Sequence, residues 1–155
     1  MKLSSSSLKK LATLDPSFLP LADELVKVGQ AAGLNVQISA GLRTPAEQDA
    51  LYAQGRTEKG KVVTNARRWT SLHNYGLAID VFFMVDGKAS WGEDLFLQLW
   101  FAAEKAKLDR RGLVWSGKWV GGFREMAHWQ LGRPDWRQLA RARGVDPVTL
   151  NKIKP

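Results

Sequence analysis

The sequence predicts an α+β fold: a single small domain in which helices flank a short antiparallel sheet. The 155 residues are enough for one domain core and too few for two. An apolar fraction of 45% with seven tryptophans supports a packed interior and excludes a disordered chain. Helical patterns cluster towards both ends around a few short strands, which favours α+β over a wound parallel sheet.

The N-terminal part predicts two helices and a strand. The Ser4–Ser7 run is typical of a helix N-cap region and precedes a short helix at Leu8–Leu14. A longer helix is expected from Pro16 to Ala32, ending at Gly33. Apolar side chains recur along it at helical spacing: Phe18, Leu21, Leu25 and Val28. The alternating residues Asn35–Ser39 predict a strand.

The middle of the chain begins with a strong helix start. Thr44 is expected to cap a helix with Pro45 in its first turn and Glu47 completing a capping box, and this helix should run to about Gln54. The basic stretch Arg56–Thr70 has no sustained period and predicts an exposed loop. The apolar stretch Ala78–Val85 is the strongest strand candidate.

The C-terminal part predicts further short elements. In order, we expect a turn at Asp86-Gly87, a helix at Glu93–Lys107, strands at Val114–Trp119 and His128–Leu131 around a Gly121-Gly122 turn, a helix at Asp135–Arg143 and a last short helix from Asp146-Pro147.

Charge and cysteine content limit the chemistry. The formal net charge of +8 favours anionic partners such as nucleic acid, acidic lipid or a wall polymer, without choosing among them. The absence of cysteine excludes disulfides, thiolate catalysis and cysteine-ligated metal sites. Any metal must therefore bind to imidazole and carboxylate groups.

Asp80 is the most unusual residue of the sequence. It interrupts the most apolar strand, where an unpaired carboxylate would pay a large desolvation penalty, so a cation must meet it. His73 lies just upstream, and Gly76 between them allows the chain to bend so that both side chains converge. A buried Asp–Arg pair with an unrelated histidine explains these isolated features about as well as a metal site does.

The second histidine favours the metal. His128 lies three residues after Glu125, and the chain has two histidines in all. Two imidazoles and one carboxylate leave a tetrahedral zinc ion with an open position, as in catalytic sites. Glu125 then suits the role of a base beside the metal-activated water.

Rival chemistries lack their motifs. Glu-x-x-His is also a di-iron pattern, but that site needs two copies on a helical bundle. The His-Glu-x-x-His helix of many metalloproteases is absent. Ser71 and Ser116 do not lie in a nucleophile elbow.

The segment from Ser71 to Asp80 (Ser-Leu-His-Asn-Tyr-Gly-Leu-Ala-Ile-Asp) resembles the Ser-x-His-x-x-Gly-x-Ala-x-Asp signature of peptidase family M15, and Glu125 to His128 matches that family's downstream Glu-x-x-His. The resemblance extends over Ile38–Gln48, Leu51–Thr57 and Val63–Ala66, and spans about residues 35–131. It implies a zinc peptidase of peptidoglycan with a hedgehog/D,D-peptidase-like fold, whose sheet carries the metal.

The resemblance also implies roles. His73, Asp80 and His128 would bind Zn²⁺, Glu125 would be the catalytic base, and Arg43 would act at the substrate carbonyl or carboxylate. Ser71 and Gln48 are expected substrate contacts, although Ser71 also suits the end of a loop and Gln48 a packing position. Trp115, Trp119 and Trp129 suit a binding groove or, more commonly, a core.

The expected bond is the L-alanyl-D-glutamate bond, because the Gln48–Thr57 pattern and the Asn74-Tyr75-Gly76 turn look most like phage endolysins. A D-alanyl-D-alanine carboxypeptidase is the alternative, and a non-enzymatic basic binding module is a weaker one. No signal peptide, transmembrane segment or wall-binding domain is evident. We therefore expect a monomer made in the host cytoplasm that reaches bacterial peptidoglycan after release, with no nucleic-acid partner and an affinity for anionic wall or outer-membrane surfaces.

Overall fold

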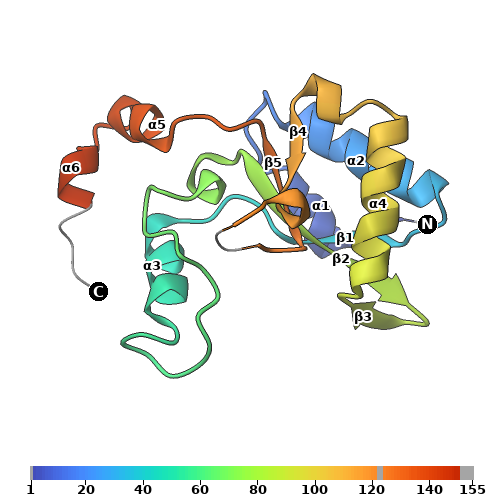
Figure 1. The fold of residues 1–155 in the computed structure, drawn as a ribbon, viewed down its shortest axis with the longest axis horizontal. Coiled ribbons are helices and arrows are strands. Elements are labelled where there is room, and N and C mark those ends of the chain that lie inside the picture. The colour runs from blue at the N-terminus through green and yellow to red at the C-terminus, as the bar shows by residue number, and fades with distance from the viewer. Residues whose placement is uncertain (1, 122–123, 151–155) are drawn as a thin grey trace.

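A computed structural model describes residues 2–121 and 124–150 and contains one antiparallel sheet at its centre (Figure 1). Neighbouring strands run in the order β1-β2-β5-β4. β5 pairs with the beginning of β2, and β3 pairs with its end. The predicted α+β fold with a short antiparallel sheet is confirmed. The strands are β1 (Val36–Ala40), β2 (Ala78–Val85), β3 (Lys88–Ser90), β4 (Leu113–Trp115) and β5 (His128–Leu131).

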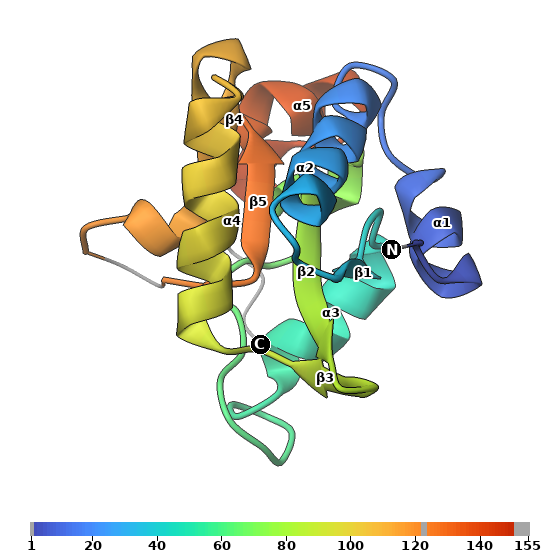
Figure 2. The same cartoon turned by 90° about the vertical axis from the view of Figure 1, so that its right-hand side faces the viewer.

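Two helices cover one face of this sheet. α2 (Leu19–Ala31) and α4 (Glu93–Lys105) lie side by side over it (Figure 2). They pack on the side chains that alternate toward them from β2, namely Ile79, Val81 and Phe83, all at most 1% exposed. Burial of this apolar layer is the main source of stability for so small a domain.

Two of the three tryptophans considered for a groove belong to this core. Trp115 is 3% exposed and Trp129 is fully buried, with stacked rings 5.4 Å apart. Both extend from β4 and β5 toward α4, where Trp100 joins the stack. Only Trp119, which follows β4, borders the cavity described below.

The opposite face of the sheet is polar where the core face is apolar. Asp80 and Phe82 alternate with the buried residues of β2 and therefore point to this second face, as His128 does from β5. At the β1 edge, α1 (Ser5–Leu11) covers this face, and Ser7 donates a hydrogen bond to Gln37. The central part of the face is left free for the functional site.

Several boundaries differ from the prediction. α1 begins at Ser5, three residues early, because Ser4 is its cap. α2 begins at Leu19, later than Pro16, because the Asp15 carboxylate accepts bonds from Ser17 and holds a turn there. The predicted strand at Val114–Trp119 is wrong beyond Trp115, where η3 (Ser116–Lys118) forms a 3₁₀ turn. β3 was not predicted.

The remaining elements frame the site or close the chain. α3 (Pro45–Ala53) has the predicted Thr44–Glu47 capping box. The other elements are η1 (Leu72–Tyr75), η2 (Asp109–Arg111), α5 (Trp136–Ala142) and α6 (Pro147–Leu150). Gly122 of the predicted glycine turn lies outside the described residues. Within the described ranges, no helix is both long and apolar enough to cross a bilayer.

Candidate metal centre and active site

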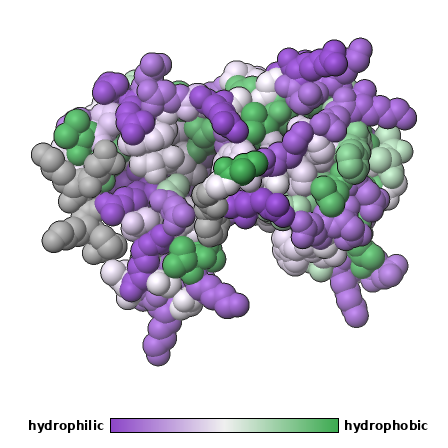
Figure 3. All heavy atoms as spheres, viewed as in Figure 1, coloured by the Kyte–Doolittle hydropathy of each residue, from purple (hydrophilic) through white to green (hydrophobic). Residues whose placement is uncertain are grey.

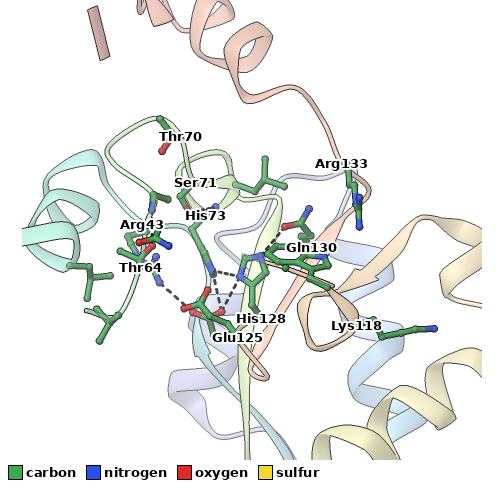
Figure 4. A pocket seen from close by; sticks show the side chains of 18 of the residues that line it. Arg43, Thr64, Thr70, Ser71, His73, Lys118, Glu125, His128, Gln130 and Arg133 are labelled. Atoms are coloured by element: carbon green, nitrogen blue, oxygen red, sulfur yellow. Dashed lines mark hydrogen bonds and ion pairs between the residues drawn. The ribbon is translucent and has the colours of Figure 1, made fainter. Parts of the chain in front are cut away.

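His73, Asp80 and His128 meet at one point on the free face of the sheet. Figure 4 shows the two histidine side chains pointing toward each other at this point. They come from η1, β2 and β5, and the strand pairing places Asp80 directly opposite His128. Gly76, with φ of +69°, turns the chain between η1 and β2; a Cβ at this position would lie 2.7 Å from the Asp15 amide nitrogen. The predicted bend at this glycine is confirmed.

Three atoms of this cluster lie at equal spacing. His73 Nε2 is 3.2 Å from Asp80 Oδ1 and 3.2 Å from His128 Nδ1, and His128 Nδ1 is 3.2 Å from Asp80 Oδ1. Ligands on a tetrahedral zinc ion with bonds near 2.05 Å lie about 3.3 Å apart. The residues therefore fit a metal of this size.

The outer nitrogen of each imidazole fixes its tautomer. His73 Nδ1 lies 2.8 Å from the Gly41 carbonyl oxygen, so it carries the proton and donates it there. His128 Nε2 lies 2.9 Å from Gln130 Oε1, which accepts in the same way. Both inner nitrogens then present lone pairs to the Asp80 carboxylate. Three acceptors facing one another require a shared cation, which is the situation of a metal-ligand set.

The ionisation of Asp80 matches this role. Burial alone would disfavour its charge, but His73 and His128 beside it hold the pKa of this carboxyl well below its usual range. Burial likewise opposes the charged form of His128, but hydrogen bonding and charge from Asp80 outweigh it and raise the pKa of His128. The cluster therefore favours a positive charge between its three side chains.

Arg43 engages the second oxygen of Asp80. Its Nη2 donates to Asp80 Oδ2 at 3.3 Å, and its Nη1 donates to Gln48 Oε1 at 2.8 Å. The two explanations considered for Asp80 therefore coexist, because one carboxylate oxygen faces arginine and the other faces the histidines. Arg43 also borders the cavity, and its planar fork has further donors to offer there.

Gln48 lies behind Arg43 and not in the cavity. It is fully buried, and its Nε2 donates to the Ala66 carbonyl oxygen at 2.7 Å. The expected direct contact between Gln48 and substrate does not fit this burial. The Gln48 amide oxygen instead holds the guanidinium of Arg43 in place, and the amide nitrogen connects α3 to the loop that contains Ala66.

Glu125 lines the cavity close to the histidines. Burial, followed by the nearby charge of Asp80, raises the pKa of Glu125. Its backbone is anchored to η3, because Ser116 Oγ accepts from the Glu125 amide at 3.1 Å and donates to the Glu125 carbonyl oxygen. Trp115 Nε1 donates to the Met126 carbonyl oxygen at 2.7 Å. A carboxyl with a raised pKa on a fixed segment suits proton transfer.

The metal cluster forms part of the floor of a cavity of about 930 Å³. Another part of the cavity lining, which we call its loop wall, comes from the predicted loop, through Val63–Ala66 and Thr70, and from Ser71. Arg56 holds this wall: Nη1 donates to the Tyr52 and Thr64 carbonyl oxygens, and Nη2 donates to Asn65 Oδ1. Ser71 Oγ accepts from the His73 amide at 3.3 Å, so it also caps η1.

Three supporting residues were missed by the sequence analysis. Gly41, Gln130 and Ser116 act through a carbonyl, an amide and a hydroxyl that carry no motif. Gln130 offered one usable signal, because a residue two positions after His128 on a strand must share its face. The Gly41 carbonyl and Ser116 depend on tertiary approach, so local pattern could not find them.

A family model described as VanY, D-alanyl-D-alanine carboxypeptidase, matches residues 12–110 of the chain. The match includes Arg43, His73 and Asp80 and ends before Glu125 and His128. The second half of the site therefore rests on the geometry described above.

Among curated proteins, the peptidoglycan L-alanyl-D-glutamate endopeptidase CwlK of Bacillus subtilis (strain 168) is 38% identical over 128 residues, covering 76% of this chain and 73% of CwlK. Among solved structures, the L-Ala D-Glu endopeptidase ChiX of Serratia marcescens superposes with a TM-score of 0.63 at 24% identity, over 84% of this chain and 90% of ChiX. A vancomycin-resistance D,D-pentapeptidase VanY mutant in complex with Zn(II) has a TM-score of 0.53 at 19% identity, over 86% of this chain and 80% of that one.

Proposed function

The chain belongs to the VanY family of D-alanyl-D-alanine carboxypeptidases, and we propose that it is a zinc-dependent peptidase that hydrolyses the L-alanyl-D-glutamate bond of peptidoglycan stem peptides. The resemblance to peptidase family M15 is thereby confirmed. The observation that carries the proposal is the meeting of His73 Nε2, Asp80 Oδ1 and His128 Nδ1 at 3.2 Å spacing, beside Glu125 in one cavity.

Zinc is the proposed ion because two imidazoles and one carboxylate form a three-ligand catalytic set. When bound, zinc acts as a Lewis acid and lowers the pKa of a coordinated water toward 7. Gly41 and Gln130 keep each imidazole in the tautomer that presents a lone pair. Arg43 keeps the Asp80 carboxylate turned so that only Oδ1 faces the histidines.

The chain's own groups would then share the proton transfers. Glu125 accepts a proton from the attacking water and returns it to the departing amine. Its raised pKa brings the two protonation states closer in free energy near neutral pH, which suits a group that must take up and release a proton in one cycle. The two hydrogen bonds between Ser116 and the Glu125 backbone hold this residue at the cavity.

Arg43 and Ser71 are the proposed substrate contacts. Arg43 would stabilise the negative charge that develops on the scissile carbonyl or would bind a substrate carboxylate. Ser71 borders the cavity with a hydroxyl whose proton is free to donate while its oxygen accepts from the His73 amide. Gln48 supports Arg43 and is proposed as a positioning residue.

The choice of bond is supported by CwlK, whose name gives the L-alanyl-D-glutamate specificity and which is 38% identical. The alternative, D-alanyl-D-alanine carboxypeptidase activity, is favoured by the description of the family model. Mass spectrometry of digested sacculi separates them. New N-terminal D-glutamate supports the proposal, whereas free D-alanine without new N-termini would replace it with the alternative.

The proposed biological role is bacteriolytic, as in a phage-type endolysin acting on the cell wall. The net charge of +8 supports association with anionic wall polymers or outer-membrane surfaces. The turbidity of purified sacculi, followed with and without a chelator, tests the role. A fall in turbidity that the chelator abolishes is expected; stable turbidity together with free peptide cleavage would limit the chain to soluble peptides.

A further inference from the structure

The metal centre has an exposed aromatic neighbour on the same face of the sheet. Trp91 follows β3 and is 59% exposed, although tryptophan is usually among the more buried residues. Its ring stacks on Phe82, with centroids 5.5 Å apart and an interplanar angle of 22°. We call this stacked pair, Trp91 on Phe82, the aromatic platform.

The strand geometry fixes where the platform lies relative to the metal. Phe82 is two residues after Asp80 on β2, so both side chains point to the same face and their Cα atoms lie about 6.6 Å apart. Phe82 is partly buried, and Trp91 closes over it from the end of β3. Figure 3 shows an indentation in the molecular surface between the region of α3 and the region of β3.

A polar link joins the platform to the catalytic segment. Arg124 Nη2 donates to Glu93 Oε1 at 2.8 Å, which ties the residue before Glu125 to the helix that begins just after Trp91. Both side chains are at least half exposed. The ion pair thus places charged hydrogen-bonding groups between the start of α4, two residues after Trp91, and the segment that carries Glu125.

We propose that the aromatic platform binds an amino-sugar ring of the peptidoglycan glycan strand, next to the peptide bond that is cut. A pyranose ring offers a face of C–H groups that packs on an aromatic ring, and its hydroxyl and acetamide groups suit Arg124 and Glu93. A flat, exposed tryptophan beside polar side chains matches this amphipathic ligand better than it matches a purely apolar surface.

The spacing supports this occupant and rests on the proposed function. In peptidoglycan the L-alanine amino group is joined through a lactyl ether to the amino sugar, so the sugar begins about 7 Å from the alanine carbonyl, roughly two residue lengths. That span is comparable to the spacing of about 6.6 Å between the Cα atoms of Asp80 and Phe82, the residue on which Trp91 stacks. A D-alanyl-D-alanine bond lies about 10 Å farther from the sugar in an extended stem, too far for the platform to assist.

The test compares two substrates that share one peptide: a disaccharide-linked L-Ala-D-Glu tripeptide, and the same tripeptide with an N-acetyl group in place of the sugar. The ratio of their kcat/KM values is measured for the zinc-loaded enzyme. We expect the wild type to prefer the sugar-linked peptide and Trp91→Ala to lower that ratio about three- to tenfold, the effect of losing one stacking contact. Trp91→Phe should retain most of it.

Phe101→Ala is the matched control, because Phe101 is a 63% exposed aromatic on α4 outside the platform, and it should leave the ratio at the wild-type value. An equal ratio in wild type and Trp91→Ala would overturn the proposal. So would a dimer in light scattering that Trp91→Ala dissociates, because the platform would then be an interface between copies.

A binding measurement separates this proposal from the proposed function. Chitotetraose, a sugar with no peptide, is titrated into the zinc-loaded protein, and the indole N–H signals are followed by NMR. A saturable shift that disappears in Trp91→Ala supports the platform even if no L-Ala–D-Glu cleavage occurs. Cleavage with no indole shift and no sugar preference would leave the peptidase intact and reject the platform.

Discussion

Arg43 Nη2 donates to Asp80 Oδ2 at 3.3 Å while Asp80 Oδ1 lies 3.2 Å from both histidine nitrogens. One carboxylate thus joins the proposed metal centre to the cation at the cavity wall. Gln48 completes the relationship by holding the other arm of the guanidinium. The Asp80 side chain therefore connects the proposed metal site with the proposed substrate contact Arg43.

Arg43→Ala should lower kcat/KM about 100-fold while zinc remains bound, since loss of one charge-stabilising donor has an effect of this order. Arg43→Lys should recover little, because an ammonium cannot bond to Asp80 and Gln48 with the geometry of the guanidinium fork. Kinetics and elemental analysis on the same samples check this. If the alanine variant lost its zinc, Arg43 would be a support of the metal site and not a substrate contact.

Glu125→Gln should keep zinc and reduce kcat by roughly 100- to 10,000-fold, the range for loss of a general base. His73→Ala and His128→Ala should lose both zinc and activity, and a chelator should reproduce their effect in the wild type until zinc is restored. Metal content and peptide hydrolysis are measured together. A zinc-free Glu125→Gln protein would make Glu125 a ligand and contradict its assignment as base.

Gln130→Ala should weaken zinc binding about 10- to 100-fold, the usual effect of removing the partner of a metal-binding histidine. His128 Nε2 loses its acceptor at 2.9 Å, so the ring no longer holds one tautomer. Competition with a zinc-binding dye measures the change. Gln98→Ala, an exposed glutamine on α4, is the control; equal affinity in the two variants would show that Gln130 does not orient His128.

Tyr75 predicts how stability depends on alkaline pH. Burial raises the pKa of Tyr75 to about 12, against an ordinary value of 10. Tyr75 is 4% exposed, and its hydroxyl donates to the Trp69 carbonyl oxygen at 2.7 Å. The folded state holds this proton more tightly than the unfolded state does. Its contribution to stability is complete below pH 10 and is lost as the pH rises through 12.

Urea unfolding at several pH values between 9 and 12 measures this contribution. The free energy of unfolding should fall less steeply with pH in Tyr75→Phe than in the wild type. At pH 9 the variant should have the lower free energy of unfolding, because it lacks the hydrogen bond to Trp69. Parallel pH dependences would show that Tyr75 titrates alike in the folded and unfolded chain.

The fold and the convergence of His73, Asp80 and His128 were predictable because their signals are local or chemically constrained. The Thr44–Glu47 capping box depends on four consecutive residues. The Asp80 carboxylate in an apolar strand requires a nearby cation, whichever strands lie beside it. The supports of the site were not predictable. The Gly41 carbonyl, the Ser116 hydroxyl and the turn that ends β4 at Trp115 depend on segments brought together by tertiary packing. Trp91 was passed over because sequence cannot distinguish an exposed tryptophan from a core one.

His73 on η1 and His128 on β5 lie 55 residues apart along the chain, and a metal shared by them would cross-link these two segments. In a chain without cysteine, such an ion would stabilise the fold as a disulfide bond does in other small proteins, since it binds the folded state and not the unfolded state. Unlike a disulfide bond, a metal cross-link is not broken by reducing agents. It would hold equally well in a reducing compartment and in an oxidising one, and it yields to acid and to sequestering agents.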